Sequence, residues 1–249
     1  MTKFATYPSL KNEAVIVTGG ASGIGASIVE HFAAQGAYVG LIDVDVEAGR
    51  AIEKNYGAAF THCDLRDIDA LRAAIAKLQL AFGPTLALVN NAARDDRHTI
   101  EEVTPAYWDD RMATNLRHQF FAAQAVLPAM RNRKRGSIVN VGSISWRLAL
   151  GGMPAYVTAK AAVEGLTRGL ARDVGADGIR VNSVIPGWIM TERQVKLWLT
   201  PESETELMAR QCLKEKLYPP DVARMVLWLA ADDSRMATAQ SFVIDGGWA

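Results

Sequence analysis

Short apolar runs alternate with amphipathic stretches along almost the whole chain, and this alternation restricts the fold more than any other feature of the sequence. The amphipathic stretches repeat apolar residues at helical spacing, as Ile24, Ile28 and Phe32 do. The apolar runs are short and apolar on both faces, which is typical of a parallel sheet that helices cover on each side. Seven runs are predicted to be strands, namely residues 14–17, 37–42, 58–60, 86–89, 137–141, 179–184 and 241–244.

Regular alternation of strand and helix predicts an α/β fold, here a Rossmann-type doubly wound parallel sheet of about seven strands with helices on both faces. The 249 residues contain no internal repeat, low-complexity segment or linker. We therefore expect a single domain that spans residues 1–249. Residues 188–217, which precede the last strand, are helical in pattern but sparsely apolar, and we predict that they form a mobile flap.

The charges of the chain balance, with 27 Lys and Arg against 27 Asp and Glu. This balance argues against nucleic-acid binding and against a polybasic membrane anchor, because both need an excess of cations. The sequence shows no export signal and no stretch that could span a bilayer, so we expect a cytoplasmic protein. Cys63 and Cys212 lie far apart without zinc-type spacing; we expect two buried, inert thiols and no metal site.

A glycine-rich turn directly follows the first predicted strand and opens the first predicted helix. Glycines allow the backbone to turn sharply and to approach a pyrophosphate, which the free N–H groups and the dipole of the helix then bind. The cofactor-binding residues predicted here are Gly19, Ser22, Gly23, Ile24 and Gly25, with Ser22 as N-cap. An ordinary glycine-rich turn is the alternative.

Asp43 ends the second predicted strand at the distance from the glycines that a dinucleotide site requires. A carboxylate at this position accepts the hydroxyls of the adenosine ribose and repels the 2′-phosphate of NADP. No Arg or Lys stands between Gly19 and Gly25 or directly after Asp43 to bind that phosphate. We therefore predict NAD rather than NADP; a plain helix cap is the alternative for Asp43.

Tyr156 and Lys160 lie four residues apart in a helical stretch, so they share one face. A tyrosine with an ordinary pKa of about 10 is a poor base at neutral pH, but a nearby ammonium favours the phenolate. The pair is therefore a candidate for acid–base catalysis. The same spacing is also common on helix surfaces, so the pair alone decides nothing.

Together with Asp43, residues 90–93 and the glycine turn, this pair resembles the short-chain dehydrogenase/reductase family, from Val15 to Gly247. The resemblance implies that Tyr156 is the general acid/base, that Lys160 lowers its pKa and binds the nicotinamide ribose, and that Ser143 binds the reacting oxygen. Asn115 would hold a water in the proton relay. The further cofactor contacts that it implies are Asp64, Leu65, Asn91, Pro186, Ile189 and Thr191. Ala93 departs from the family's usual glycine.

The family resemblance also implies a homotetramer that is formed through residues 105–133 and 154–175. We expect the loops of this single domain to recognise the substrate, and these loops combine indole rings with hydrogen-bonding groups. Such a lining suits a small neutral sugar better than a steroid or a fatty acyl chain. The predicted substrate-binding residues are Arg94, Ser143, Ser145, Trp146, Tyr156, Trp188 and Gln194. Alternatively, Trp188 packs in the core, and Asp95 or Asp96 forms a salt bridge with Arg97.

Several of these stretches, including residues 91–98 and 142–146, resemble the bacterial NAD(P)-dependent aldose 1-dehydrogenases within this family. The resemblance implies oxidation of the anomeric hydroxyl of L-arabinose, D-galactose or D-xylose to the lactone. A general short-chain reductase or alcohol dehydrogenase, for example for 3-oxoacyl thioesters, is the alternative enzyme. A non-catalytic NAD-binding protein is the alternative outside enzymes. The preferred aldose and its anomer stay open.

Overall fold

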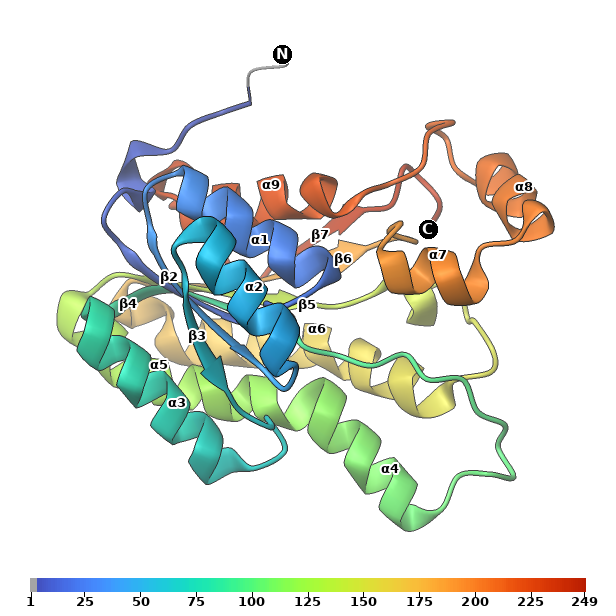
Figure 1. Cartoon of the computed structure of the whole chain (residues 1–249), viewed down its shortest axis with the longest axis horizontal. Coiled ribbons are helices and arrows are strands. Elements are labelled where there is room, and N and C mark those ends of the chain that lie inside the picture. Colours follow the sequence, from blue (N-terminus) through green and yellow to red (C-terminus); the bar gives the residue numbers. More distant parts are fainter. Residues whose placement is uncertain (1–3) are drawn as a thin grey trace.

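A computed structural model describes residues 4–249, so the first three residues of the predicted domain lie outside it. Its centre is one seven-stranded sheet, parallel throughout, in the order β3-β2-β1-β4-β5-β6-β7 (Figure 1). The strands are β1 (Ala14–Thr18), β2 (Tyr38–Asp43), β3 (Ala59–His62), β4 (Thr85–Asn90), β5 (Gly136–Val141), β6 (Ile179–Pro186) and β7 (Ser241–Ile244). The predicted fold class and all seven strands are therefore confirmed, with ends displaced by one or two residues.

Helices cover both faces of the sheet (Figure 1). They are α1 (Gly23–Ala34), α2 (Val46–Tyr56), α3 (Ile68–Phe82), α4 (Pro105–Met112), α5 (His118–Arg133), α6 (Pro154–Val174), α7 (Glu192–Trp198), α8 (Pro201–Arg210) and α9 (Pro219–Ala230). A short π-helix, Ala113–Arg117, joins α4 to α5. No helix in residues 4–249 is both long enough and apolar enough to cross a membrane.

The strands supply two separate cores because successive side chains point to opposite faces. In β1, Val15 and Val17 pack with α1 and α9, whereas Ile16 packs with α3, α5 and α6. Each of these three side chains is at most 2% exposed. Burying one such side chain contributes about 1.5–3 kcal/mol, so a polar residue on either face would be costly.

The order of the strands positions the site. The chain moves from β1 outward to β2 and β3, and then returns to place β4 on the other side of β1. The loops that leave β1 and β4 therefore diverge, and they leave a crevice at the carboxyl ends of the strands, which is where ligands bind in open α/β sheets. The glycine turn and residues 91–98 are these two loops.

The two cysteines differ in their surroundings. Cys63 is buried, and burial raises the pKa of its thiol to about 11, in agreement with an inert group. Cys212 is exposed, so the prediction of two buried thiols is wrong for this residue. It follows the end of α8 and lies against Gly247 at the surface, where a loop rather than a core surrounds it.

Candidate active site

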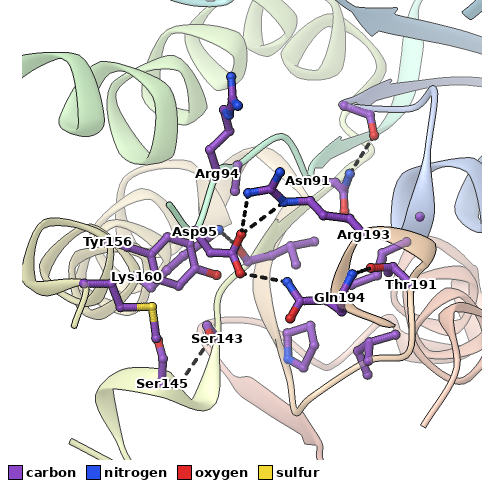
Figure 2. Close-up of a pocket in the computed structure, with 18 of the residues that line it drawn as sticks. Asn91, Arg94, Asp95, Ser143, Ser145, Tyr156, Lys160, Thr191, Arg193 and Gln194 are labelled. Carbon is purple, nitrogen blue, oxygen red and sulfur yellow. Dashed lines mark hydrogen bonds and ion pairs between the residues drawn. The ribbon is translucent and has the colours of Figure 1, made fainter. Parts of the chain in front are cut away.

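A cleft of about 1340 Å³ follows the carboxyl ends of the strands. Its walls come from the loops after β1, β2, β3, β4, β5 and β6 and from α7 and α8. The glycine turn and Asp43 lie along the same cleft as Ser143, Tyr156 and Lys160. Nearly all the predicted site residues are thus brought together from segments far apart in the chain, and Figure 2 shows part of this wall.

The glycine turn has the geometry that close approach of a pyrophosphate requires. Gly19 and Gly23 have φ of +64° and +54°, which side chains other than glycine rarely adopt. A Cβ on Gly25 would lie 1.8 Å from the carbonyl oxygen of Gly19, so this position admits only glycine. Ser22 is the N-cap of α1, as predicted, but its hydroxyl makes no capping hydrogen bond within the described chain. The hydroxyl and the first N–H groups of α1 are thus available to an anion.

Two backbone N–H groups hold the carboxylate of Asp43 at the end of β2. Oδ2 accepts from Ala21 at 3.0 Å and Oδ1 accepts from Asp45 at 3.1 Å. A carboxylate oxygen has two acceptor directions, so each still has one for a ribose hydroxyl. Ser22, Asp43 and the cradle of glycines together fit the adenosine and pyrophosphate parts of a dinucleotide.

Further along this end of the cleft, Asp64 forms an ion pair with Arg66 at 2.6 Å. Hydrogen bonds from Arg66 lower the pKa of Asp64, and Arg66 also pairs with Asp110. Leu65 lines the cleft beside them and is 8% exposed. Asp64 and Leu65 thus line the same cleft as Asp43, with Arg66 as a neighbour that the sequence did not single out.

Asn91 braces the glycine turn from β4. Its Nδ2 donates to the carbonyl oxygens of Gly19 at 2.8 Å and Thr18 at 3.2 Å. Ala92 lies directly below the turn, because a Cβ on Gly19 would be 2.7 Å from its Cα. The Asn91 side chain therefore serves to hold the turn, and it faces the cleft as well.

Tyr156 and Lys160 both lie on the first turns of α6, and the ammonium of Lys160 is 5.7 Å from the centre of the Tyr156 ring. Lys160 is 1% exposed and donates to the carbonyl of Val141 at 2.7 Å. Burial lowers the pKa of Lys160 to about 8, and the charge of Asp95 opposes this. The side chain is thus anchored in the cleft wall with a charge that burial disfavours.

Burial raises the pKa of Tyr156 to about 12. A hydrogen bond with Ser143 and the charge of Arg97 lower this pKa, and the charge of Asp95 raises it. The sequence argument expected a lowered pKa with Lys160 as the cause. In the protein by itself, the effect of burial on the pKa of Tyr156 is larger than that of the neighbouring cations. The expected lowering of this pKa is therefore wrong for the protein without the positively charged nicotinamide beside the phenol.

Ser143 lines the cleft, whereas Asn115 is fully buried and is not among the residues that line it. Asn115 lies in the π-helix, a deviation that is frequent at functional sites. Its Oδ1 accepts from the N–H of Arg94 at 2.8 Å, and its buried Nδ2 has no partner among residues 4–249. Ser143 accepts from the N–H of Ser145 at 3.1 Å, and the hydroxyl of Ser145 is itself buried without a partner in this part of the chain. Such unsatisfied groups are expected where a ligand or a water belongs.

The predicted flap consists of α7, α8 and the segments beside them. Pro186 ends β6, and Ile189 then pairs with Leu217 in an isolated parallel bridge. Thr191 caps α7 by accepting from the N–H of Gln194 at 3.2 Å. Its methyl group would be 3.1 Å from a Cβ on Gly23, so the flap begins directly beside the glycine turn.

A chain of hydrogen bonds ties α7 to the loop after β4. The indole N–H of Trp188 donates to Gln194 at 2.9 Å, and the amide of Gln194 donates to Asp95 at 2.7 Å. Arg193 adds ion pairs to Asp95 and Asp96 at 3.4 and 3.0 Å. Figure 2 shows Arg193 and Gln194 converging on the carboxylate of Asp95, across from Tyr156. The flap is therefore connected to the opposite wall in this conformation.

Two predicted substrate contacts lie differently from the expectation. Trp146 is not among the residues that line the cleft; its indole N–H donates to Glu164 of α6 at 3.1 Å. The prediction for Trp146 is wrong because the 3₁₀ turn after Ser143 directs its ring toward α6. Arg94 does line the cleft, but in Figure 2 its side chain points away from Tyr156.

The alternative interpretation, a salt bridge of Arg97 with Asp95 or Asp96, is not found within residues 4–249. Asp96 pairs with Arg94, Arg111 and Arg193, and Asp95 pairs with Arg193. Arg111 comes from α4, and it is 9% exposed. Arg111 and Arg193 lie outside the loop, so no local pattern could have identified them. The sequence analysis also missed several residues of the substrate end, namely Asp95, Arg97, Met153, Trp198 and Trp248.

Comparison with known proteins gives consistent matches. The family model described as enoyl-(acyl carrier protein) reductase matches residues 19–249. D-xylose 1-dehydrogenase of Caulobacter vibrioides is 47% identical over 249 residues, 98% of each chain. The probable galactose dehydrogenase of Rhizobium meliloti is 47% identical, over 97% of this chain and 96% of that one. A 3-alpha-(or 20-beta)-hydroxysteroid dehydrogenase of Mycobacterium bovis is 35% identical, over 96% and 90%.

Proposed function

The chain belongs to the short-chain dehydrogenase/reductase family, and from this premise we propose that it is an NAD-dependent aldose 1-dehydrogenase. As a member of this family it is an oxidoreductase that acts on CH–OH donors. Two relatives at 47% identity over nearly their full length carry the names of sugar dehydrogenases, whereas the steroid enzyme is 35% identical. The proposed reaction converts the anomeric hydroxyl of L-arabinose, D-galactose or D-xylose to the lactone.

The proposed chemistry assigns each polar group of the site one task. Tyr156, as phenolate, removes the proton of the anomeric hydroxyl, and Ser143 donates a hydrogen bond to the same oxygen. Lys160 supplies a positive charge beside Tyr156 and binds the ribose of the cofactor, and Asn115 holds a water that relays the proton. A bound nicotinamide would supply the acceptor for the hydride that leaves the anomeric carbon. The phenolate is accessible at neutral pH only if positive charge offsets the effect of burial on Tyr156.

The cofactor is proposed to be NAD because of Asp43. Its carboxylate is held by two backbone N–H groups where the adenosine ribose belongs, and it would repel a 2′-phosphate. We propose that the remaining cofactor contacts are those that the family resemblance implies, including Pro186, Ile189 and Thr191. A cytoplasmic location and a homotetramer, formed through residues 105–133 and 154–175, belong to the same proposal.

The observation that carries the proposal is the meeting of Ser143, Tyr156 and Lys160 with the glycine turn in one cleft. The test is NADH formation by the purified protein with a panel of aldoses, secondary alcohols and 3-oxoacyl thioesters, each with NAD and with NADP. We expect turnover with at least one of the three named aldoses and NAD. Reaction with an alcohol or a thioester but with no aldose would favour the general reductase instead.

The Tyr156→Phe variant serves as the matched test of catalysis in that panel, since it removes only one hydroxyl. We expect kcat to fall by about 10²- to 10⁴-fold, the range of general acid–base catalysis. NADH binding, measured by fluorescence, should stay unchanged. Unchanged turnover would exclude Tyr156 as the base.

A further inference from the structure

Arg97 is unusual among the arginines of the cleft. Arg66, Arg94, Arg111 and Arg193 each lie within 4 Å of a carboxylate. For Arg97, no carboxylate partner exists within residues 4–249, although Asp95 and Asp96 are its neighbours in sequence. The two aspartates are occupied by Arg111 of α4 and Arg193 of α7, and Asp96 also pairs with Arg94. A charged group with five N–H donors is therefore left available to the cleft.

The contacts of Arg97 hold the guanidinium without saturating it. Its Cζ lies 5.0 Å from the centre of the Trp198 ring on α7, and Nη1 donates to the sulfur of Met153 at 2.8 Å. A thioether is a weak acceptor, and the indole face offers no lone pair. Stacking thus fixes the position of the planar group between the flap and the start of α6, while most of its donors remain free.

The guanidinium lines the same cleft as Tyr156. Its charge lowers the pKa of the Tyr156 phenol, and the opposite charge of Asp95 raises it. The lining of this cleft also contains Ser145, whose hydroxyl has no partner, and Trp198, whose buried indole N–H finds no acceptor in the described chain. Several donors without acceptors in one place favour a ligand that is rich in oxygen acceptors.

From this geometry we propose that Arg97 is a specificity-determining residue that recognises two neighbouring hydroxyl oxygens of the sugar, apart from the anomeric one. The proposal rests on the proposed aldose 1-dehydrogenase function. A guanidinium can donate two parallel hydrogen bonds, and the hydroxyl oxygens on two adjacent carbons of a sugar ring match that fork. Because Trp198 stacks on Arg97, binding of the sugar also engages the flap.

The test combines protein and substrate variants in one cycle. Wild-type enzyme and Arg97→Leu are assayed with NAD and the named aldose that the wild type oxidises fastest, and with the analogues of this aldose that each lack one hydroxyl other than the anomeric one. If Arg97 binds one of these hydroxyls, its removal lowers kcat/KM of the wild type by about 10- to 100-fold, as expected for a hydrogen bond to a charged group. In Arg97→Leu the same removal should cost less than about 3-fold, since the hydroxyl has already lost its partner.

Two variants separate this role from others. Arg97→Lys keeps the charge but not the fork, so an intermediate penalty is expected. Arg147→Leu is the matched control: Arg147 also stacks on an indole, 5.5 Å from the centre of Trp146, but it pairs with Glu164 and is absent from the cleft lining. We expect this control to keep the wild-type penalties. NADH binding by each variant verifies that it folds.

The outcomes distinguish the two proposals. If the wild type oxidises one of the named aldoses and the deoxy penalties are the same in Arg97→Leu and Arg97→Lys as in the wild type, Arg97 does not bind the sugar hydroxyls, and only this inference is wrong. Absence of any penalty in the wild type has the same meaning. If none of the aldoses supports reduction of NAD by the wild type, the proposed function is wrong, and the role proposed for Arg97 is then wrong as well.

Discussion

Burial shifts the pKa values of two ionisable side chains on α6, Tyr156 and Lys160, in opposite directions. Burial raises the pKa of Tyr156 to about 12 and lowers that of Lys160 to about 8, so each neutral form is favoured. The protein therefore disfavours both charges that the proposed chemistry requires. Positive charge next to the phenol would stabilise the phenolate form of Tyr156 that burial disfavours. Catalysis is therefore linked to binding of the positively charged cofactor.

The lowered pKa of Lys160 predicts a specific dependence of stability on pH. Between about pH 8 and 10 the unfolded chain binds more protons than the folded chain, so the free energy of unfolding should rise with pH in this window. Lys160→Met removes the ionisable group, and this rise should be smaller in that variant. Urea unfolding at pH 7 to 9.5 measures the difference. Lys77→Met, at an exposed position of α3, is the control; equal slopes for Lys160→Met and wild type would contradict the prediction.

Asp43 makes a second prediction at this scale, for cofactor choice. Asp43→Ala removes the charge that would repel the 2′-phosphate, together with the acceptors for the ribose hydroxyls. We expect the ratio of kcat/KM for NAD to that for NADP to fall by at least about 10-fold, roughly the effect of one close charge pair. Initial rates with both cofactors measure this ratio. A ratio that does not move would mean that Asp43 does not contact the ribose.

Among the elements, the start of α6 shows how the loop after β4 supports the catalytic helix. The side chain of Met153, the N-cap of α6, makes no capping hydrogen bond, and Pro154 has no N–H. His98 supplies the missing acceptor: its Nε2 accepts from the N–H of Ala155 at 3.3 Å, and the backbone N–H of His98 donates to the carbonyl of Gly152 at 2.8 Å. The ring also packs against Tyr107 of α4. One histidine thus joins residues 94–98 to the turn that carries Tyr156.

We therefore expect His98→Leu to lower kcat by about 10-fold with little change in KM for NAD. The free N–H of Ala155 would cost about 1 kcal/mol, as the loss of a helix cap does, and would loosen the helix at Tyr156. His98→Gln keeps an acceptor near the position of Nε2 and should restore most of kcat. If both variants behave alike in steady-state kinetics, the hydrogen bond to Ala155 has no role in positioning Tyr156.

At the scale of the whole molecule, an apolar surface on α4, α5 and α6 is exposed to solvent in the single chain. An apolar groove of about 410 Å³ lies outside α4, α5 and α6, and it includes Met112, Leu116, Phe120 and Leu166. It is on the helices through which the proposed homotetramer would form. Helix α6 contributes to both hollows, with Tyr156 and Lys160 in the active-site cleft and Ala162 and Leu166 in this groove, so assembly would press on the helix that carries Tyr156 and Lys160.

Phe120→Asp is expected to reduce the order of assembly. The ring is 42% exposed, so the change should leave the fold of a single chain intact while it places a charge in the proposed interface. Light scattering coupled to size-exclusion chromatography measures the mass. Leu80→Asp, at a position of α3 that is 90% exposed, is the control and should keep the wild-type mass. A Phe120→Asp protein of wild-type mass would exclude this face as an interface.

The sequence by itself determined the features that depend on local chemistry. The alternation of apolar runs and helical repeats predicted the seven-stranded sheet, since backbone periodicity is local. The glycine turn, Asp43 and the pair Tyr156 and Lys160 could be found for the same reason: their spacing along the chain is itself part of the geometry. These residues do line one cleft.

Only the tertiary structure decided what depends on neighbours that are distant in sequence. Arginines of α4 and α7 pair with Asp95 and Asp96, and Arg94 also pairs with Asp96, which left Arg97 without a carboxylate within the described chain. Trp146 turned toward Glu164, and the pKa of Tyr156 rose although a lysine lies four residues away. The burial and the ion pairs of a side chain depend on all the residues that pack around it, and the whole fold determines which residues these are.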